Sequence, residues 1–177
     1  MEQYQDVWVN GRRVLRGVRE CEARYELVRA FVSRFSRPLT VLDIGAASGY
    51  FSIRLAEDFS DCTVVAIDFD PRLPAILERN GNPRVILLHR RTSLRELGEL
   101  AGAEQFDVVL ALSVVHHLGG TYGQSLSTLS SLGDHLVVEI PVEVERRAYG
   151  QQVVQQAYVP ADAELLGYSE SHLERNV

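Results

Sequence analysis

Short apolar runs alternate with segments of helical spacing over most of this chain, and this alternation constrains the fold more than any other feature. The runs lack the apolar–polar alternation of a sheet with one face in water, so a sheet built from them must be covered on both faces. The helical segments provide that cover and connect the strands in parallel. We therefore predict an α/β fold with a doubly wound, Rossmann-like, mostly parallel sheet and helices on both faces, with strands at 40–44, 63–67, 84–88, 107–112 and 135–140 and helices at 49–57, 72–79, 93–101 and 123–132.

The two ends of the chain show further patterns. Apolar residues at helical spacing predict a helix within 19–35, which Arg37-Pro38 then ends. After the last predicted strand, 149–158 has a helical pattern and 165–168 is a candidate for one more strand.

Charge is distributed unevenly along the chain. The net charge is −6, but residues 1–37 hold eight Arg against five acids (+3), while 38–177 hold ten Arg against nineteen acids (−9). The acidic body argues against broad nucleic-acid binding, although it allows a local basic patch of Arg12, Arg13, Arg16 and Arg19. We expect a single domain, 1–177, with 1–37 as a helical, basic extension and 38–177 as the core.

Other features of the composition limit the class of protein. No run approaches the roughly 18 apolar residues that a bilayer span needs, and the N-terminus lacks the apolar core of a signal peptide. Cys21 and Cys62 are isolated, so they predict neither a disulfide framework nor a zinc site, and we expect no bound metal. The chain is therefore predicted to be cytoplasmic, with reduced cysteines and no membrane span.

The first predicted strand runs into the break 45-GAASG-49, at the place where open α/β sheets bind their ligands. A phosphate-binding P-loop needs a lysine, and every one of the 18 basic residues here is Arg. The glycine spacing also differs from the GxGxxG of dinucleotide-binding folds. What remains is Asp43-x-Gly45-x-x-x-Gly49, with Asp68 at the end of the next predicted strand.

This arrangement suits a nucleoside without phosphates. Gly45 allows a close approach of the backbone, and Gly49 permits the turn into the helix. The Asp68 carboxylate can accept both hydroxyls of a ribose, and Asp43 can face a cationic amino group. Adenosine joined to an amino acid is S-adenosylmethionine, which we predict as the cofactor.

The chain resembles the class I S-adenosylmethionine-dependent methyltransferases in "VLDIGAASGYFS", "VVAIDFD" and "FDVVLAL". The resemblance implies a methyltransferase whose transferred methyl group lies near the end of the third stretch, with residues 1–37 covering the cofactor. The family often has an acid near the adenine after its third strand, and 90-RRT-92 contains none. The cofactor-binding residues that we predict are Asp43, Gly45, Ala46, Ala47, Gly49, Asp68, Phe69, Arg24 and Ser113, with Arg24 pairing with the cofactor carboxylate.

A narrower resemblance covers roughly 38–173. "LSVVHHL", "VEIPVEVERRAYG" and "ELLGYSESHL" are similar to the methyltransferase domain of bacterial enzymes that terminate O-antigen chains by methylating a terminal phosphate. Those enzymes are much longer, with a kinase domain and a coiled coil. Their pattern continues into a last strand that usually begins Arg-Pro, whereas this chain ends at Val177. We therefore expect the last of the usual seven strands to be missing or truncated, and the open edge to pair with a second copy or a partner chain, or to be shielded.

The resemblance places His116 and His117 in the active site, and we predict them as catalytic residues together with Glu139. An alcohol acceptor would need a histidine as general base, whereas a phosphate is already anionic and would need cationic donors such as Arg146 and Arg147. The acceptor is expected to be a phosphate or sugar-phosphate terminus. The alternatives are a small-molecule hydroxyl, an RNA 5′-phosphate, or a non-catalytic protein that binds the cofactor or acts as a partner subunit.

Overall fold

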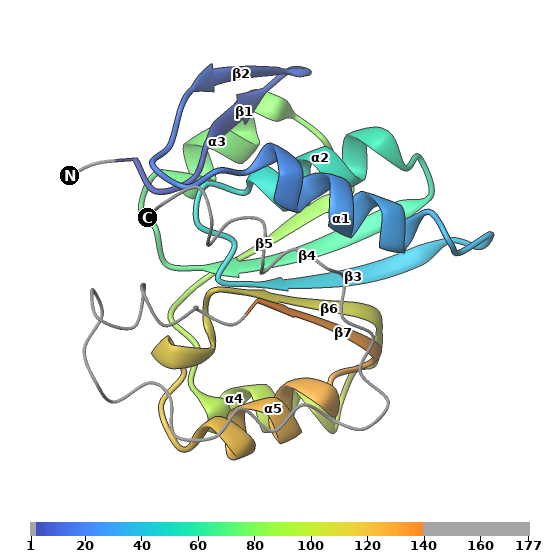
Figure 1. Cartoon of the computed structure of the whole chain (residues 1–177), viewed down its shortest axis with the longest axis vertical. Coiled ribbons are helices and arrows are strands. Elements are labelled where there is room, and N and C mark those ends of the chain that lie inside the picture. Colours follow the sequence, from blue (N-terminus) through green and yellow to red (C-terminus); the bar gives the residue numbers. More distant parts are fainter. Residues whose placement is uncertain (1–2, 140–177) are drawn as a thin grey trace.

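The computed structural model describes residues 3–139, which form a central sheet between two layers of helices (Figure 1). The strand order is β5-β4-β3-β6-β7, and every neighbouring pair is parallel. The predicted fold class is confirmed, and the predicted strands agree with the observed ones to within two residues at each end. The observed strands are β3 (Leu39–Ile44), β4 (Cys62–Asp68), β5 (Val85–His89), β6 (Phe106–Leu112) and β7 (Gly133–Glu139).

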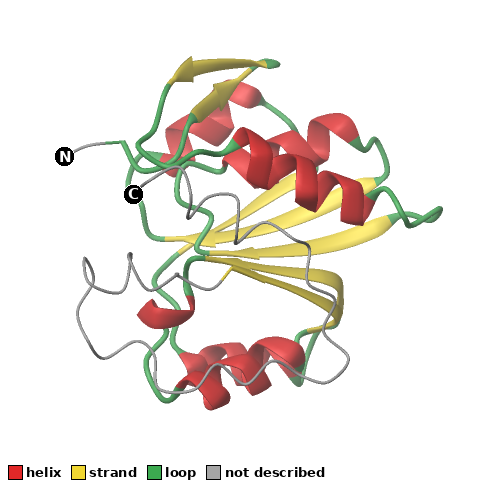
Figure 2. Ribbon diagram, viewed as in Figure 1, coloured by secondary structure: helices red, strands yellow, loops and turns green. Residues whose placement is uncertain are grey.

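Helices cover both faces of the sheet (Figure 2). One face carries α1 (Glu22–Val32), α2 (Tyr50–Asp58) and α3 (Leu73–Asn80), and the other carries α4 (Leu94–Ala101) and α5 (Tyr122–Ser130). Val41 and Leu42 are adjacent in β3 and fully buried, yet they belong to different core clusters. Neighbouring side chains of a strand point to opposite faces, so a strand covered on both sides must be apolar at nearly every position.

The helix starts follow local chemistry. Ser93 and Thr121 each accept a hydrogen bond from the backbone N–H three residues later, and Glu96 and Gln124 bond back to complete two capping boxes. α3 ends at Gly81, whose φ of 61° is a left-handed conformation that glycine adopts without strain.

The N-terminal segment contains a hairpin that the sequence analysis did not predict. β1 (Val7–Val9) and β2 (Arg12–Leu15) pair antiparallel around Asn10-Gly11, whose φ angles are 50° and 73°. Two positive φ angles in a two-residue loop are typical of a type I′ turn, which Asn-Gly favours. The hairpin is fixed to the end of α3, because Asn80 accepts from the Asn10 N–H at 3.0 Å and donates to the Trp8 carbonyl at 3.0 Å.

The strand order reverses beside β3, since β4 lies on one side of it and β6 on the other. Ligands of open α/β sheets bind at the carboxyl ends of the strands at such a point. The register of β3 and β4 pairs Ile44 with Ile67, so the glycine break begins directly beside Asp68.

Within residues 3–139, no helix is long and apolar enough to cross a bilayer. The predicted helix at 149–158, the candidate strand at 165–168, the missing last strand and the arginines Arg146 and Arg147 lie outside the described residues. Those expectations stay predictions, as does a partner at the open sheet edge.

Candidate active site

The glycine break forms a tight loop between β3 and α2. Gly45 has a φ of 76°, and a Cβ there would lie 2.6 Å from the Val114 Cγ2. The neighbour that requires a glycine here is therefore the Val114 side chain, in the loop after β6. Ala47 also has a positive φ, 51°, which is uncommon for a residue with a side chain.

Asp68 fixes the loop from the neighbouring strand. Its Oδ2 accepts from the Ala47 N–H at 2.8 Å, and its Oδ1 accepts from the Asp70 N–H at 2.7 Å. A carboxylate offers about four lone-pair positions, so each oxygen retains one after these bonds. Two such positions on one carboxylate match the two hydroxyls of a ribose.

Asp43 lies at the end of β3 under the loop and is 3% exposed. Its Oδ2 accepts from the Ser52 hydroxyl at 2.5 Å. Burial raises the pKa of Asp43 to about 6, against the hydrogen bond from Ser52. The group therefore changes charge near neutral pH, which is unusual for an aspartate.

Phe69 follows Asp68 and is the most exposed aromatic residue at this edge, with 54% of its surface in solvent. The Arg91 guanidinium lies 4.1 Å from its ring centroid. This pair comes from the ends of β4 and β5, so it flanks the loop on the side away from β6.

Two arginines from the N-terminal segment meet Glu139 at the end of β7. Arg24 Nη2 donates to Oε2, and Arg19 Nη2 donates to Oε1 at 2.8 Å and to the Ser113 hydroxyl at 3.1 Å. Arg24 is 5% exposed, and its Nη1 is buried without a hydrogen bond among the described residues. The three charged side chains together carry one positive charge beside the end of β6.

The two predicted catalytic histidines lie in the short helix η1 (Val115–His117), with their ring centroids 3.9 Å apart. Burial, together with the charges of His117 and Arg19, lowers the pKa of His116 to about 4. His116 is therefore uncharged at neutral pH and is a weak base.

The N-terminal segment also touches the glycine break. The Ser48 hydroxyl donates to the Asp6 carbonyl at 2.7 Å, and the Asp6 carboxylate accepts from the Gly17 N–H at 2.7 Å. Gly17 packs so closely that a Cβ there would lie 2.3 Å from the Gln5 backbone. Gln5 and Asp6 therefore lie against the loop that the sequence identified.

The structure brings several predicted residues together. Arg24, Ser113 and Glu139 belong to one hydrogen-bonded group, and Asp43 lies close enough to Arg24 and Asp68 for both charges to affect its pKa. Arg19 appeared in the sequence only as part of a basic patch, and Ser52 was not singled out. Arg19 belongs to the site through residues that are distant in the sequence, and Ser52 through a buried contact with Asp43. Neither contact can be read from a single sequence.

A family model described as a methyltransferase domain matches residues 42–137. This chain belongs to the class I S-adenosylmethionine-dependent methyltransferases. The predicted family membership is confirmed, and S-adenosylmethionine is the cofactor of the class, as predicted. Two features of the site fit that molecule: the two open positions on the Asp68 carboxylate, and the buried Arg24 Nη1, which can bond an amino-acid carboxylate.

The methyltransferase has a curated relative in Escherichia coli, described as the O-antigen chain terminator bifunctional methyltransferase/kinase WbdD. The two are 30% identical over 145 residues, which cover 75% of this chain and 20% of the relative. This chain thus spans about a fifth of the length of the curated relatives it matches.

Solved structures agree with this relationship. Monomeric WbdD has a TM-score of 0.61 and 28% identity, with coverage of 80% of this chain and 36% of that one. The N-terminal domain of EvdMO1, solved with SAH and D-fucose, has a TM-score of 0.59 at 19% identity over 76% of this chain and 57% of that one, which shows the shared fold.

Proposed function

We propose that this methyltransferase transfers a methyl group to an oxygen of an anionic acceptor, a phosphate or sugar-phosphate terminus. The observation that carries the proposal is the position of Arg19, which extends from the N-terminal segment to Ser113 after β6 and to Glu139 at the end of β7. The side chain is largely buried, with 15% exposed, so its charge is poorly screened there. A guanidinium has five N–H donors and suits a phosphate better than a hydroxyl.

The cofactor is proposed to bind along the carboxyl ends of β3 and β4. Asp68 accepts the ribose hydroxyls, Asp43 faces the amino group and Arg24 Nη1 bonds the carboxylate. Gly45, Ala46, Ala47 and Gly49 form the floor, Phe69 lies on the adenine side, and Ser113 lies on the side of the transferred methyl group. When bound, S-adenosylmethionine supplies a methyl group activated by its sulfonium.

The ionisation of His116 distinguishes its role toward an alcohol from its role toward a phosphate. With a pKa of about 4, His116 is too weak a base to be an effective acceptor of the proton of an alcohol. A phosphate monoester has a second pKa of about 6 and is already a dianion at neutral pH, so it needs orientation and charge stabilisation instead of a base. In this role an uncharged histidine donates its ring N–H, and His116 and His117 are proposed to orient the acceptor.

Glu139 is proposed to act by holding the two arginines. Its carboxylate receives Arg19 on one oxygen and Arg24 on the other, so it fixes one guanidinium near the cofactor and the other near the acceptor. The relative's name also supports a phosphate acceptor, because it combines a methyltransferase with a kinase, an activity that forms phosphate esters.

The proposal is tested by supplying labelled methyl donor with matched acceptors. We expect kcat/KM for a sugar phosphate or a phosphorylated glycan to exceed that for the same compound without phosphate by at least about 100-fold, because the unphosphorylated compound cannot form charge-assisted hydrogen bonds between its phosphate and Arg19. A 5′-phosphorylated RNA oligonucleotide and a small alcohol form the remaining arms. Equal transfer to phosphorylated and unphosphorylated sugars would contradict the proposal, and transfer to RNA alone would replace the glycan with RNA.

A further inference from the structure

A buried hydroxyl in α2 determines the surroundings of Asp43. Ser52 lies in the first turn of the helix and is fully buried, and its hydroxyl donates to the Asp43 Oδ2 at 2.5 Å. A serine differs from an alanine only by its hydroxyl, and the hydroxyl of Ser52 bonds to Asp43. The buried position and the short bond therefore indicate that the role of this hydroxyl is to bind the Asp43 carboxylate.

The groups that face Asp43 come from three elements. Burial and the charge of Asp68 in β4 both favour its neutral acid form, whereas Arg24 of α1 and the hydrogen bond from Ser52 of α2 favour the carboxylate. Burial outweighs the groups that favour the carboxylate, and the resulting pKa of about 6 leaves Asp43 mostly charged at neutral pH and half charged about one unit below it. The backbone N–H of Ser52 also favours the charge and is unaffected by a change of side chain, and Arg24 donates to Glu139, so the Ser52 hydroxyl is the only direct side-chain donor to Asp43 within residues 3–139.

We propose that Ser52 is a positioning residue that holds Asp43 as the carboxylate required by the ammonium group of the cofactor, and thereby sets the lower pH limit of cofactor binding. This role rests on the proposed function, in which Asp43 faces that amino group. An ammonium group gains little from a neutral acid, so the affinity follows the charged fraction of Asp43.

The sign of the pH dependence follows directly. In the wild type, affinity for the cofactor falls as the pH decreases through about 6, where Asp43 takes up a proton. Removing the Ser52 hydroxyl removes a group that lowers the pKa of Asp43, so the same fall occurs at higher pH. A hydrogen bond to a charged group corresponds to a shift of about one pH unit.

The test is calorimetric titration with S-adenosylhomocysteine between pH 5 and 8, a range in which the carboxyl group of the ligand stays ionised and its amino group stays largely protonated. Ser52→Ala should move the midpoint upward by about one unit and leave the affinity at the highest pH least affected. Asp43→Asn should bind weakly and show no midpoint in this range. The matched control is Ser125→Ala, which removes another buried helical hydroxyl, one that bonds to the Gly119 carbonyl, and should keep the wild-type midpoint.

Each outcome decides the question. A midpoint in Ser52→Ala that coincides with the wild type would overturn the role of Ser52, and a persistent midpoint in Asp43→Asn would assign the titration to another group and overturn it as well. If Ser52→Ala does not fold, as judged by circular dichroism, Ser52→Cys takes its place, because a thiol of similar shape is a weak donor and should also move the midpoint upward. Absence of binding by the wild type at every pH would refute the proposed function itself, which distinguishes the two failures.

Discussion

Replacing Arg19 with glutamine is expected to lower kcat/KM for a phosphorylated acceptor by at least about 100-fold, because charge-assisted hydrogen bonds to a phosphate are lost in a largely buried site. Glutamine keeps hydrogen-bonding capacity near Ser113 and Glu139 but removes the charge. Glu139 retains Arg24, so its carboxylate is not left without a cation. The dissociation constant for S-adenosylhomocysteine should therefore stay within about threefold of the wild type.

Steady-state kinetics with labelled methyl donor and a calorimetric titration measure these two quantities. Arg95→Gln is the matched control, because the Arg95 side chain is 79% exposed in α4 and pairs only with Glu99 among the described residues. Both quantities should be unchanged in that variant. If Arg19→Gln weakens cofactor binding as much as it slows transfer, Arg19 belongs to the cofactor site and the proposed division between the arginines is wrong.

The second large effect concerns stability. Replacing Arg54 with methionine is expected to lower the free energy of unfolding by about 3 kcal/mol. The substitution removes the buried guanidinium, and with it the cation–π contacts to the rings and the hydrogen bonds to Tyr50 and Glu22. The Arg54 guanidinium lies 4.1 Å from the Tyr25 ring centroid and 4.3 Å from that of Trp8, and it donates to the Tyr50 hydroxyl at 2.7 Å and to Glu22 at 2.9 Å.

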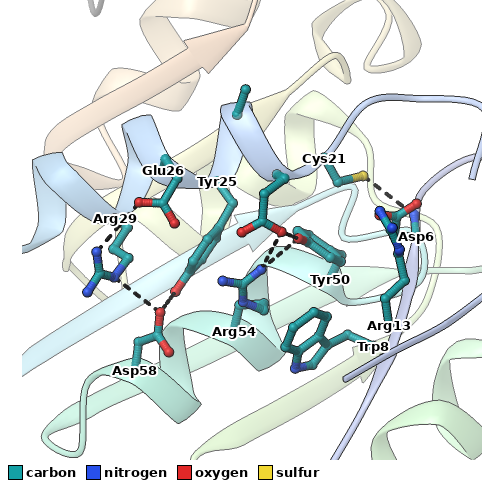
Figure 3. Close-up of polar contacts among 12 residues, drawn as sticks. Asp6, Trp8, Arg13, Cys21, Tyr25, Glu26, Arg29, Tyr50, Arg54 and Asp58 are labelled. Carbon is teal, nitrogen blue, oxygen red and sulfur yellow. Dashed lines mark hydrogen bonds and ion pairs between the residues drawn. The ribbon is translucent and has the colours of Figure 1, made fainter. Parts of the chain in front are cut away.

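Figure 3 shows how this group joins three parts of the chain. Trp8 comes from the hairpin, Tyr25 from α1, and Tyr50 and Arg54 from α2, and Arg54 lies among the three rings. The Tyr25 hydroxyl also bonds to Asp58 at 2.7 Å at the end of α2. Because the N-terminal segment carries Arg19 and Arg24, this cluster holds the site arginines against the core.

Urea unfolding measures the loss, with Trp8 fluorescence and circular dichroism as two probes. Trp8 is the only tryptophan of the chain, so its fluorescence reports on the cluster itself. Arg95→Met should change the stability by less than about 0.5 kcal/mol, since exposed helical ion pairs contribute little. A loss below about 1 kcal/mol in Arg54→Met would show that the hairpin is held mainly by other contacts.

The sheet could be predicted because its signals are local. The buried strands are nearly continuous apolar runs, and each is followed by helical spacing, so periodicity alone placed β3 to β7. The glycine break and Asp68 followed from the same pattern, since the carboxyl ends of neighbouring parallel strands lie at one edge. The hairpin, which was not predicted, also has a local signal, because Asn10-Gly11 between VWV and RRVL is typical of a type I′ turn.

The side-chain partners of the site could not be predicted in the same way. Arg19 meets Glu139 across 120 residues and Ser113 across 94, and nothing in the local sequence of either end identifies the other. Gly45 matched a ligand-binding pattern, but the atom that requires a glycine there belongs to Val114. The pKa of Asp43 depends on burial and on Asp68, Arg24 and Ser52, which come together only in the folded chain.

A titration of the wild type and of Asp68→Asn with S-adenosylhomocysteine tests whether the carboxyl ends of β3 and β4 bind S-adenosylmethionine through Asp68. We predict saturable binding at one site in the wild type and an affinity at least about tenfold lower in the variant, because the amide offers one acceptor oxygen where the carboxylate offers two. Asp134→Asn, at an exposed position of β7, should bind like the wild type. No heat from the wild type at millimolar ligand, or equal affinity in Asp68→Asn, would contradict the account.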